Sequence, residues 1–323
     1  MKRDEIVLGQ GYILDGEDLP NFNALIVGIS GAGKSLSVVF PTVSRMENAN
    51  PVLSYAKETD AYYMAEYLKM KGYNVHVLNI VHPDRSTIGF DPIMFIQSFE
   101  DIDSLAADII DSVLRKTADD YWQAKAKPLL KSLITASLML ESDNKSIPRM
   151  VDVLRLFDQL IPHENGYSVE TPLDSLFERI EIKNPGCYAC REYTSWHSLP
   201  YRTASCVRDT LAAALSTVFP EPIRKMMGEK PQFDVQKFVQ NKEALIVITS
   251  AMESSQQYYG NLFYRNIERQ LLRYAATCPN GELPREVRYI FDDFACTAPI
   301  RGWACELFAN ETLQKWKQVS GAE

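Results

Sequence analysis

The sequence has few cysteines, no long apolar run and no excess of positive charge. Its six cysteines are unevenly spaced along 323 residues, which is typical of a reducing compartment and excludes a small disulfide-built fold. The apolar runs, such as residues 244–249, are far shorter than the roughly 18 to 20 residues that span a bilayer, and no signal peptide is recognisable. We therefore expect a soluble chain in a cytoplasm.

The charge balance also excludes one class of protein. Lys and Arg number 34 against 42 Asp and Glu, so the net charge is −8, the opposite of a generally basic nucleic-acid coat. Hydrophobic residues make up 46% and charged residues 24%, as in ordinary globular proteins. At one to two hundred residues per domain, this length predicts about two domains, or one large fold with an insertion.

Short, apolar, β-branched segments predict the strands of a parallel sheet. The run 23–28 stops at a glycine and indicates a buried strand. Similar runs occur at residues 52–53, 75–78, 244–249 and 287–291. Residues 60–71 have apolar positions at helical spacing and end before Gly72, which favours a helix between two of the strands. This alternation predicts an α/β fold.

The middle of the chain follows a different period. Between residues 96 and 241, apolar side chains recur at helical spacing, as in the stripe of Ile102, Leu105 and Ile109. We therefore expect an α/β domain made of residues 1–95 and 242–323, interrupted by an all-α domain of residues 96–241.

Residues 28–35 fit the phosphate-binding loop G-x-x-x-x-G-K-S/T at every fixed position, after a predicted strand and before a predicted helix. In such a loop, glycines let backbone N–H groups surround the phosphates, Lys34 reaches the β and γ phosphates, and Ser35 offers its hydroxyl to Mg²⁺. The predicted cofactor-binding residues are Gly28, Ser30, Gly31, Ala32, Gly33, Lys34 and Ser35. The motif predicts a site for ATP and Mg²⁺.

Two adjacent aspartates follow the last predicted strand. P-loop enzymes take the acid that holds Mg²⁺ from the end of a neighbouring strand, so Asp292 is the expected metal ligand together with Ser35. Asp293 points to another side and would orient or deprotonate the attacking water, which makes it, with Lys34, the predicted catalytic residue. The alternative is an acidic cap on a following helix.

Several motifs occur in an order that resembles the TraG/TraD-like family, the coupling-protein ATPases of bacterial conjugation and type IV secretion. The similar segments are residues 29–35, 54–58, 90–93, 121–122, 171–177 and 291–296. The sequence departs from the family pattern in two places. The acidic pair of the family is Asp-Glu, so the side chain of Asp293 is one methylene shorter than the family's glutamate. In residues 54–58, the family's aspartate, proline and glycine are missing, and Lys57 is the best match to the family segment. Compared with the family, we expect the N-terminal membrane helices and the C-terminal part of the motor domain to be lacking.

The resemblance implies a RecA-like P-loop nucleotide-binding domain with an inserted all-α domain, at the cytoplasmic side of a bacterial inner membrane. It implies a motor that binds ATP, forms a hexameric ring in its full-length form, and drives single-stranded DNA with a relaxase or secreted protein toward the secretion channel. Substrates would dock on the helical domain, and channel ATPases or membrane components would be partners. The alternative is an adaptor that binds nucleotide without hydrolysing it; an unrelated P-loop kinase is disfavoured because no small-substrate site is visible.

Four residues of the middle region could together bind zinc. Cys187 and Cys190 form a C-x-x-C pair, and His197 and Cys206 follow. Because the spacing beyond the first pair is irregular, ordinary cysteines of a helical domain are the favoured interpretation.

A basic cluster surrounds two aromatic residues, Tyr121 and Trp122, which could stack on bases while the cations contact phosphates. The favoured interpretation is instead a solvated helix face with Trp122 packed inside. The basic residues are Arg115, Lys116, Lys125, Lys127 and Lys131.

Overall fold

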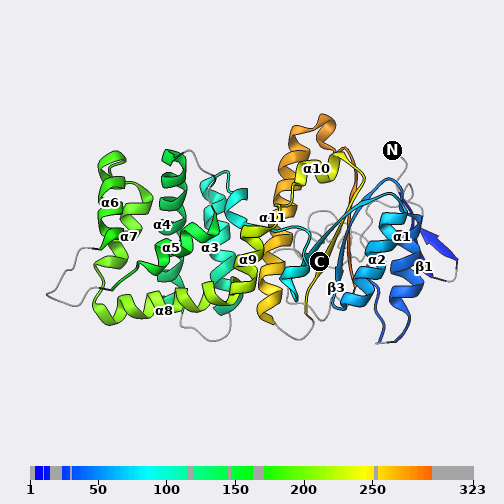
Figure 1. Ribbon diagram of the computed structural model, residues 1–323, viewed down its shortest axis with the longest axis horizontal. Helices are drawn as coiled ribbons and strands as arrows, with labels where there is room; N and C mark the ends of the chain where they lie inside the picture. The colour runs from blue at the N-terminus through cyan, green and yellow to red at the C-terminus, as the bar shows by residue number, and fades with distance from the viewer. Residues whose placement is uncertain are drawn as a thin grey trace, which may run out of the picture. The chain divides into compact units, whose positions relative to one another are not determined.

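The structure is a computed structural model that separates the chain into two units. It describes residues 4–9, 11–14, 24–29, 31–114, 120–144, 147, 149–162, 171–250 and 254–292. One unit, here called the sheet unit, combines residues 1–88 with residues 233–323, and the other, the helical unit, consists of residues 89–232. The helical unit runs from cyan to yellow-green in Figure 1.

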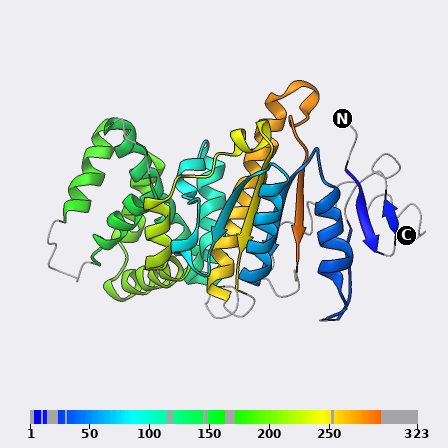
Figure 2. The ribbon, with the colours of Figure 1, turned by 45° about the vertical axis from the view of Figure 1, so that its right-hand side comes forward.

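The sheet unit is built on four parallel strands. They are β3 (Asn50–Tyr55), β4 (Asn74–Asn79), β5 (Glu243–Ile248) and β6 (Val287–Phe291). Their order in the sheet is β4-β5-β3-β6, so strands from both ends of the chain alternate. Figure 2 shows these strands side by side, with β6 in orange. The α/β sheet predicted from the short apolar runs is confirmed.

Burial explains why these strands carry continuous apolar runs. Every residue of β3 and of β5 is buried, because both strands have a neighbour on each edge. The helix α2 (Glu58–Met70) covers this core with an apolar stripe at positions 61, 64, 65 and 68, which is the spacing of one helix face. It ends before Gly72, whose φ of 83° requires glycine. The described part of the unit also contains the α-helices α1 (Phe40–Arg45), α10 (Val235–Gln240) and α11 (Ser254–Thr277).

The strand predicted over residues 23–28 is wrong for its described part. Residues 24–29 form no strand, and the side chains of Leu25 and Val27 are 76% and 86% exposed. A β-branched apolar run forms a strand only where a neighbouring strand supplies hydrogen-bond partners, and no described strand pairs with this segment. Composition gave the correct preference for strand, but pairing decides whether one forms.

The sheet unit also has a short hairpin near the N-terminus, for which the sequence predicts no strand. Its strands β1 (Ile6–Gly9) and β2 (Tyr12–Leu14) pair antiparallel. Val7 N–H donates to the hydroxyl of Thr42 over 3.0 Å, and the buried Asp4 carboxylate accepts from the Ala49 N–H over 2.8 Å. These bonds fix the segment against the helix that follows the phosphate loop.

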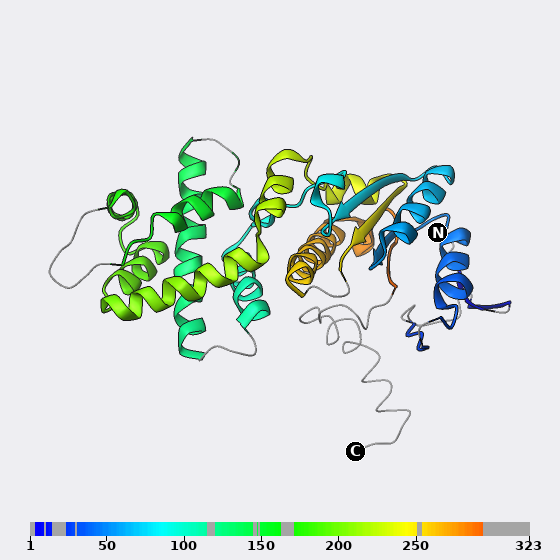
Figure 3. The same cartoon turned by 60° about the horizontal axis from the view of Figure 1, so that its bottom comes forward.

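The helical unit contains the helices predicted from the apolar stripes. Its described helices are α3 (Phe99–Leu114), α4 (Asp120–Asn144), α5 (Met150–Asp158), α6 (Pro172–Lys183), α7 (Tyr188–His197), α8 (Tyr201–Val218) and α9 (Glu221–Glu229). The helix α4 contacts α3, α7 and α8, and Figure 3 shows it crossing α8. The stripe of Ile102, Leu105 and Ile109 is buried, as expected.

In the part of the chain that the structure describes, no helix is long and apolar enough to cross a membrane.

Candidate nucleotide and magnesium site

The phosphate-binding loop owes its shape to two glycines in the left-handed region. Gly31 and Gly33 have φ values of 79° and 80°, which residues with a side chain rarely adopt. Between them, the Ala32 N–H donates to the Ile29 carbonyl over 3.2 Å and closes a tight turn. Such turns point successive N–H groups toward one side, which suits a phosphate.

Lys34 bends back over this loop. Its ammonium group donates to the carbonyl oxygens of Gly28, at 3.0 Å, and Ile29, at 3.2 Å. A lysine in this position has its charge at the mouth of the loop, where it can transfer these hydrogen bonds to phosphate oxygens.

The loop leads directly into a helix. Its first turn is η1 (Ser35–Val39), a π-helix, and α1 continues from Phe40. The Ser37 N–H and hydroxyl both donate to the Gly33 carbonyl, over 2.8 and 2.5 Å, and so join the loop to this first turn. The helix predicted after the loop is therefore present, and its N-terminus with its partial positive charge lies at the loop.

Ser35 and Asp292 meet across the site. Asp292 follows β6, and its N–H donates to the Ser54 carbonyl over 3.1 Å, which continues the pairing with β3 by one residue. The Ser35 hydroxyl donates to the Asp292 carboxylate over 2.7 Å. Two oxygen ligands of the kind that Mg²⁺ prefers thus lie within one coordination shell, so the residues present fit this metal.

The carboxyl ends of all four strands lie at one edge of the sheet, because the strands are parallel. In open α/β sheets, ligands bind at this edge. Tyr55, at the end of β3, is buried; desolvation and the charge of Asp292 raise the pKa of its hydroxyl well above the usual range. Tyr55 therefore stays neutral, and Asp292 is the acidic group that faces Ser35.

The segment after β3 has a structural role at the same edge. Glu58, the first residue of α2, accepts hydrogen bonds from Asn79, at 2.6 Å, and from Arg85, at 2.9 Å. It thereby connects the end of β3 to the end of β4. Lys57, the best match to the family segment, is exposed at the N-cap of α2.

The structure places the predicted site residues as follows. Lys34 and its loop lie beside Ser35, and Asp292 reaches Ser35 from β6. Ser30 and Asp293 lie outside the described residues.

Asp91, in the similar segment 90–93, serves the structure of the helical unit. Its carboxylate accepts from the N–H of Ile93, at the start of the 3₁₀ helix η3 (Pro92–Phe95), and from the N–H of Met150, at the start of α5. Only 2% of Asp91 is exposed, and burial raises the pKa of the carboxyl group to about 6 despite these hydrogen bonds. Asp91 therefore caps the N-termini of two helices, η3 and α5. It has a structural role and lies far from the phosphate loop in the sequence.

Two lysines of the basic cluster form ion pairs with α3. Lys127 lies 2.5 Å from Asp111, and Lys131 lies 2.5 Å from Asp103. The ring of Tyr121 meets that of Trp122 edge to face, at a centroid distance of 5.0 Å. Arg115 and Lys116 lie outside the described residues. The ion pairs favour a helix face that packs on α3 over a phosphate-binding surface.

Of the four possible zinc ligands, the structure brings two together. The sulfur atoms of Cys187 and Cys190 are 3.2 Å apart, and the carboxylate of Glu181 lies beside them. His197 instead lies 3.3 Å from Asp174, and Cys206 is exposed on α8. Sequence spacing could not reveal Glu181, because it belongs to the preceding helix.

The fold and the loop define a P-loop protein of the α/β class with an inserted helical domain. Residues 2–297 match the family described as type IV secretory system conjugative DNA transfer, and the chain belongs to this family. The resemblance inferred from the motifs is confirmed.

Two solved structures are similar in fold. One is the plasmid coupling protein TrwB in complex with the non-hydrolysable GTP analogue GDPNP, with a TM-score of 0.54 and 15% identity over 88% of this chain and 59% of that chain. The other is the unbound monoclinic form of the bacterial conjugative coupling protein TrwBdeltaN70, with a TM-score of 0.52 and 15% identity over 88% of this chain and 57% of that chain. The similarity confirms the predicted RecA-like architecture with a helical domain.

This chain spans less than two thirds of the length of either structure. Among proteins with curated functions, none matches the chain.

Proposed function

We propose that this chain binds ATP with Mg²⁺ at the phosphate loop and forms part of the motor of a conjugative coupling protein. The observation that carries the proposal is the hydrogen bond of 2.7 Å between Ser35 and Asp292. It joins the loop to the strand end from which P-loop enzymes take their metal ligand. The GDPNP complex of the structurally similar TrwB supports a nucleotide as ligand.

The phosphate chain of ATP lies in the loop. We expect backbone N–H groups of the loop to bind it, with that of Ala32 exchanging its bond to the Ile29 carbonyl for a phosphate oxygen, and the N-terminus of η1 adds its partial positive charge. Lys34 exchanges its bonds to the Gly28 and Ile29 carbonyls for the β and γ phosphate oxygens.

Ser35 and Asp292 hold the metal. When bound, Mg²⁺ neutralises charge on the β and γ phosphates. Both residues would supply hard oxygen atoms of the kind that Mg²⁺ prefers. The Ser35 hydroxyl could offer a lone pair to the metal while it still donates its proton to Asp292.

Asp293 orients the attacking water. It adjoins the metal ligand in sequence, and we expect the side chains of adjacent residues at a strand end to serve different sides of the site. Because an aspartate is one methylene shorter than the glutamate of the family, we expect slow turnover. The alternative function is the adaptor described above, which binds ATP and does not hydrolyse it.

The remaining roles rest on family membership. The helical unit docks a relaxase or secreted protein, full-length chains form a hexameric ring around single-stranded DNA, and the ring works beside channel ATPases or membrane components at the cytoplasmic side of the inner membrane. Because Lys127 and Lys131 form ion pairs with α3, we expect DNA to contact the ring and not this face of α4.

The test is steady-state ATP hydrolysis with Mg²⁺, with and without single-stranded DNA, at several protein concentrations. We expect turnover that DNA stimulates and that rises faster than linearly with protein, because assembly completes the site. Asp293→Asn is expected to abolish turnover and to leave ATP affinity nearly unchanged. Tight ATP binding without turnover under every condition would support the adaptor instead.

A further inference from the structure

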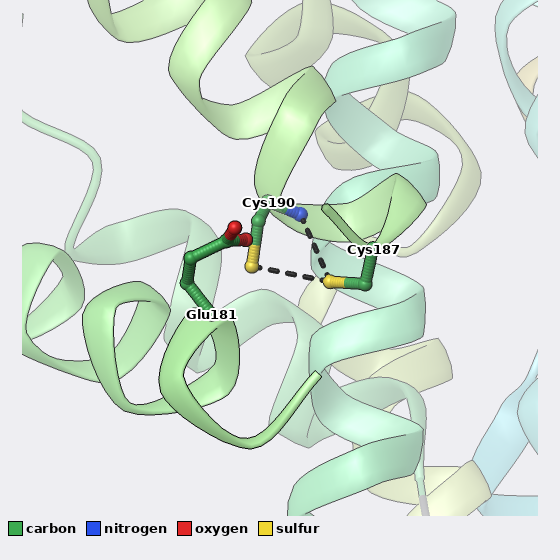
Figure 4. Close-up of side chains that lie close together, drawn as sticks. All are labelled: Glu181, Cys187 and Cys190. Carbon is green, nitrogen blue, oxygen red and sulfur yellow. Dashed lines mark hydrogen bonds between the residues drawn. The ribbon is translucent and has the colours of Figure 1, made fainter. Parts of the chain in front are cut away.

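Three potential metal ligands converge between α6 and α7 of the helical unit. They are the carboxylate of Glu181 and the sulfur atoms of Cys187 and Cys190, and their ligand atoms all lie within 4.8 Å of one another. Figure 4 shows the three side chains facing one another, with Glu181 on the helix before the cysteines. No function proposed above uses this cluster.

The two cysteines are held by the first turn of α7. Cys187 is the N-cap of this helix, and its sulfur accepts the N–H of Cys190 at 3.4 Å. The sulfur atoms, 3.2 Å apart, therefore point to the same space. Burial and the hydrogen bonds with Cys187 and Glu181 raise the pKa of the Cys190 thiol, so a cation has to displace its proton in order to bind.

Glu181 is positioned by the turn that joins the helices. One of its carboxylate oxygens accepts the N–H of Gly186 at 2.7 Å, and the carboxylate is also hydrogen-bonded to the Cys190 thiol, whose proton a bound cation would replace. Gly186 has a φ of 69°, so the turn depends on glycine. Hydrogen bonds of this kind orient carboxylate ligands in metal sites.

We propose that Glu181, Cys187 and Cys190 bind one thiophilic divalent cation of the zinc type, which ties the end of α6 to the start of α7. Two thiolates and a carboxylate are a zinc donor set, with water as the fourth ligand. A tetrahedral zinc ion holds such ligand atoms about 3.5 to 3.8 Å apart. The sulfur atoms need to separate by about 0.5 Å to reach this spacing.

The cluster is accessible to an ion from solvent. Glu181 is exposed and Cys187 is partly exposed, whereas Cys190 is 5% exposed and forms the inner wall. The ion displaces the thiol protons as it binds, and no oxidant or reductant is involved. An intramolecular disulfide is the competing fate of two such cysteines and has a different chemical signature.

The test uses the full chain, reduced with a phosphine, and Co²⁺ as a spectroscopic probe. We expect one equivalent of Co²⁺ to produce thiolate-to-cobalt charge transfer and the visible bands of a tetrahedral site, and Zn²⁺ to remove both. Binding of Co²⁺ at Ser35 and Asp292 gives no sulfur band, so the two sites are distinguished.

Variants assign the ligands. The double substitution Cys187→Ser with Cys190→Ser is expected to abolish the charge-transfer band, and Glu181→Gln to weaken Co²⁺ affinity by at least about 10-fold. Cys206→Ser, at an exposed cysteine of α8, is the matched control and keeps the wild-type titration. Far-ultraviolet circular dichroism shows whether each variant is folded.

Three results would overturn the proposal. The first is a sulfur band that persists without Cys187 and Cys190. The second is an unchanged affinity in folded Glu181→Gln. The third is the absence of a band at stoichiometric Co²⁺ when a thiol assay shows both cysteines free.

Discussion

The Ser35 hydroxyl donates a hydrogen bond to the Asp292 carboxylate over 2.7 Å, although 257 positions separate the two residues. More than half of that separation is the helical unit, because the chain leaves the sheet unit after residue 88 and returns to it at residue 233. The sheet unit therefore has to pair β6 with β3 before the site exists. A hydroxyl and a carboxylate at this distance are close enough to bind the same Mg²⁺ ion.

Asp292→Asn should have opposite effects with and without Mg²⁺. With Mg²⁺, loss of the charged ligand weakens ATP binding by about 10- to 100-fold, which corresponds to about 1.5 to 3 kcal/mol for an interaction with a charged group. With EDTA, the carboxylate only repels the phosphates, so the variant binds ATP as well as the wild type or better. Calorimetric titration under both conditions measures the difference.

The control for this prediction is Asp60→Asn, at an exposed aspartate in the first turn of α2. It should bind like the wild type under both conditions. Equal weakening of Asp292→Asn with Mg²⁺ and with EDTA would show that Asp292 supports the fold of the loop rather than a metal.

Lys34→Ala should lose discrimination between ATP and ADP. Because the lysine reaches both the β and γ phosphates, its loss weakens ATP binding more than ADP binding, by about 10- to 100-fold for ATP. Competition against a fluorescent nucleotide gives both affinities. Lys69→Ala, which removes an exposed lysine paired with Glu66 on α2, is the matched control. Tight ATP binding by Lys34→Ala would remove the phosphate-loop assignment.

Substitutions of Gly31 should rank by their tolerance of a positive φ. A Cβ added at Gly31 meets no atom within 4 Å, so only the backbone at φ 79° resists substitution, by about 1 to 2 kcal/mol. We expect ATP affinity to fall least for Gly31→Asn, more for Gly31→Ala and most for Gly31→Val, because asparagine adopts this region most readily. Gly228→Ala, at a glycine on α9 with open space around it, should leave affinity unchanged.

Equal affinities across the Gly31 series would show that the loop reaches a different backbone conformation when it binds nucleotide.

The strands that the sequence predicted correctly are those whose burial demands apolar residues. In β5, all six residues are buried, and the run of apolar residues at 244–248 records this directly. Residues 24–27 have the same sequence as residues 244–247, but Leu25 and Val27 are exposed because no described strand pairs with them. Local composition contains no information about such pairing between distant segments. An apolar run in the sequence therefore predicts a strand correctly only where the fold also supplies a strand to pair with it.

The site shows the same division. The loop residues Lys34 and Ser35 were predictable because one local motif contains them, and Asp292 because it ends an apolar strand. Glu181 was not predictable, since its position beside Cys190 depends on the turn at Gly186 between two helices. Likewise, Asp91 resembled a family landmark, but its contact with Met150 joins segments 59 positions apart.

Asp91 should make the stability of the helical unit dependent on pH. The folded pKa of about 6 lies above the ordinary value of 3.8, so the folded chain holds this proton more tightly than the unfolded chain. The proton on Asp91 therefore adds to the free energy of unfolding. This contribution is complete below pH 4 and decreases as the pH rises through 6. It amounts to about 3 kcal/mol at 1.36 kcal/mol per pKa unit. Asp91→Asn has no proton to lose, so the wild type should lose stability relative to this variant between pH 4 and pH 7.

Urea unfolding, followed by tryptophan fluorescence, to which the buried Trp196 of the same unit contributes, measures the difference at each pH. Asn accepts the N–H bonds of Ile93 and Met150 with one oxygen only, which shifts the variant's stability by an amount that does not vary with pH. Asp209→Asn, at an exposed aspartate of α8, should keep the wild-type profile. If wild type and Asp91→Asn have parallel profiles from pH 4 to 7, the hydrogen bonds from Ile93 and Met150 outweigh burial, and the pKa of Asp91 is not raised.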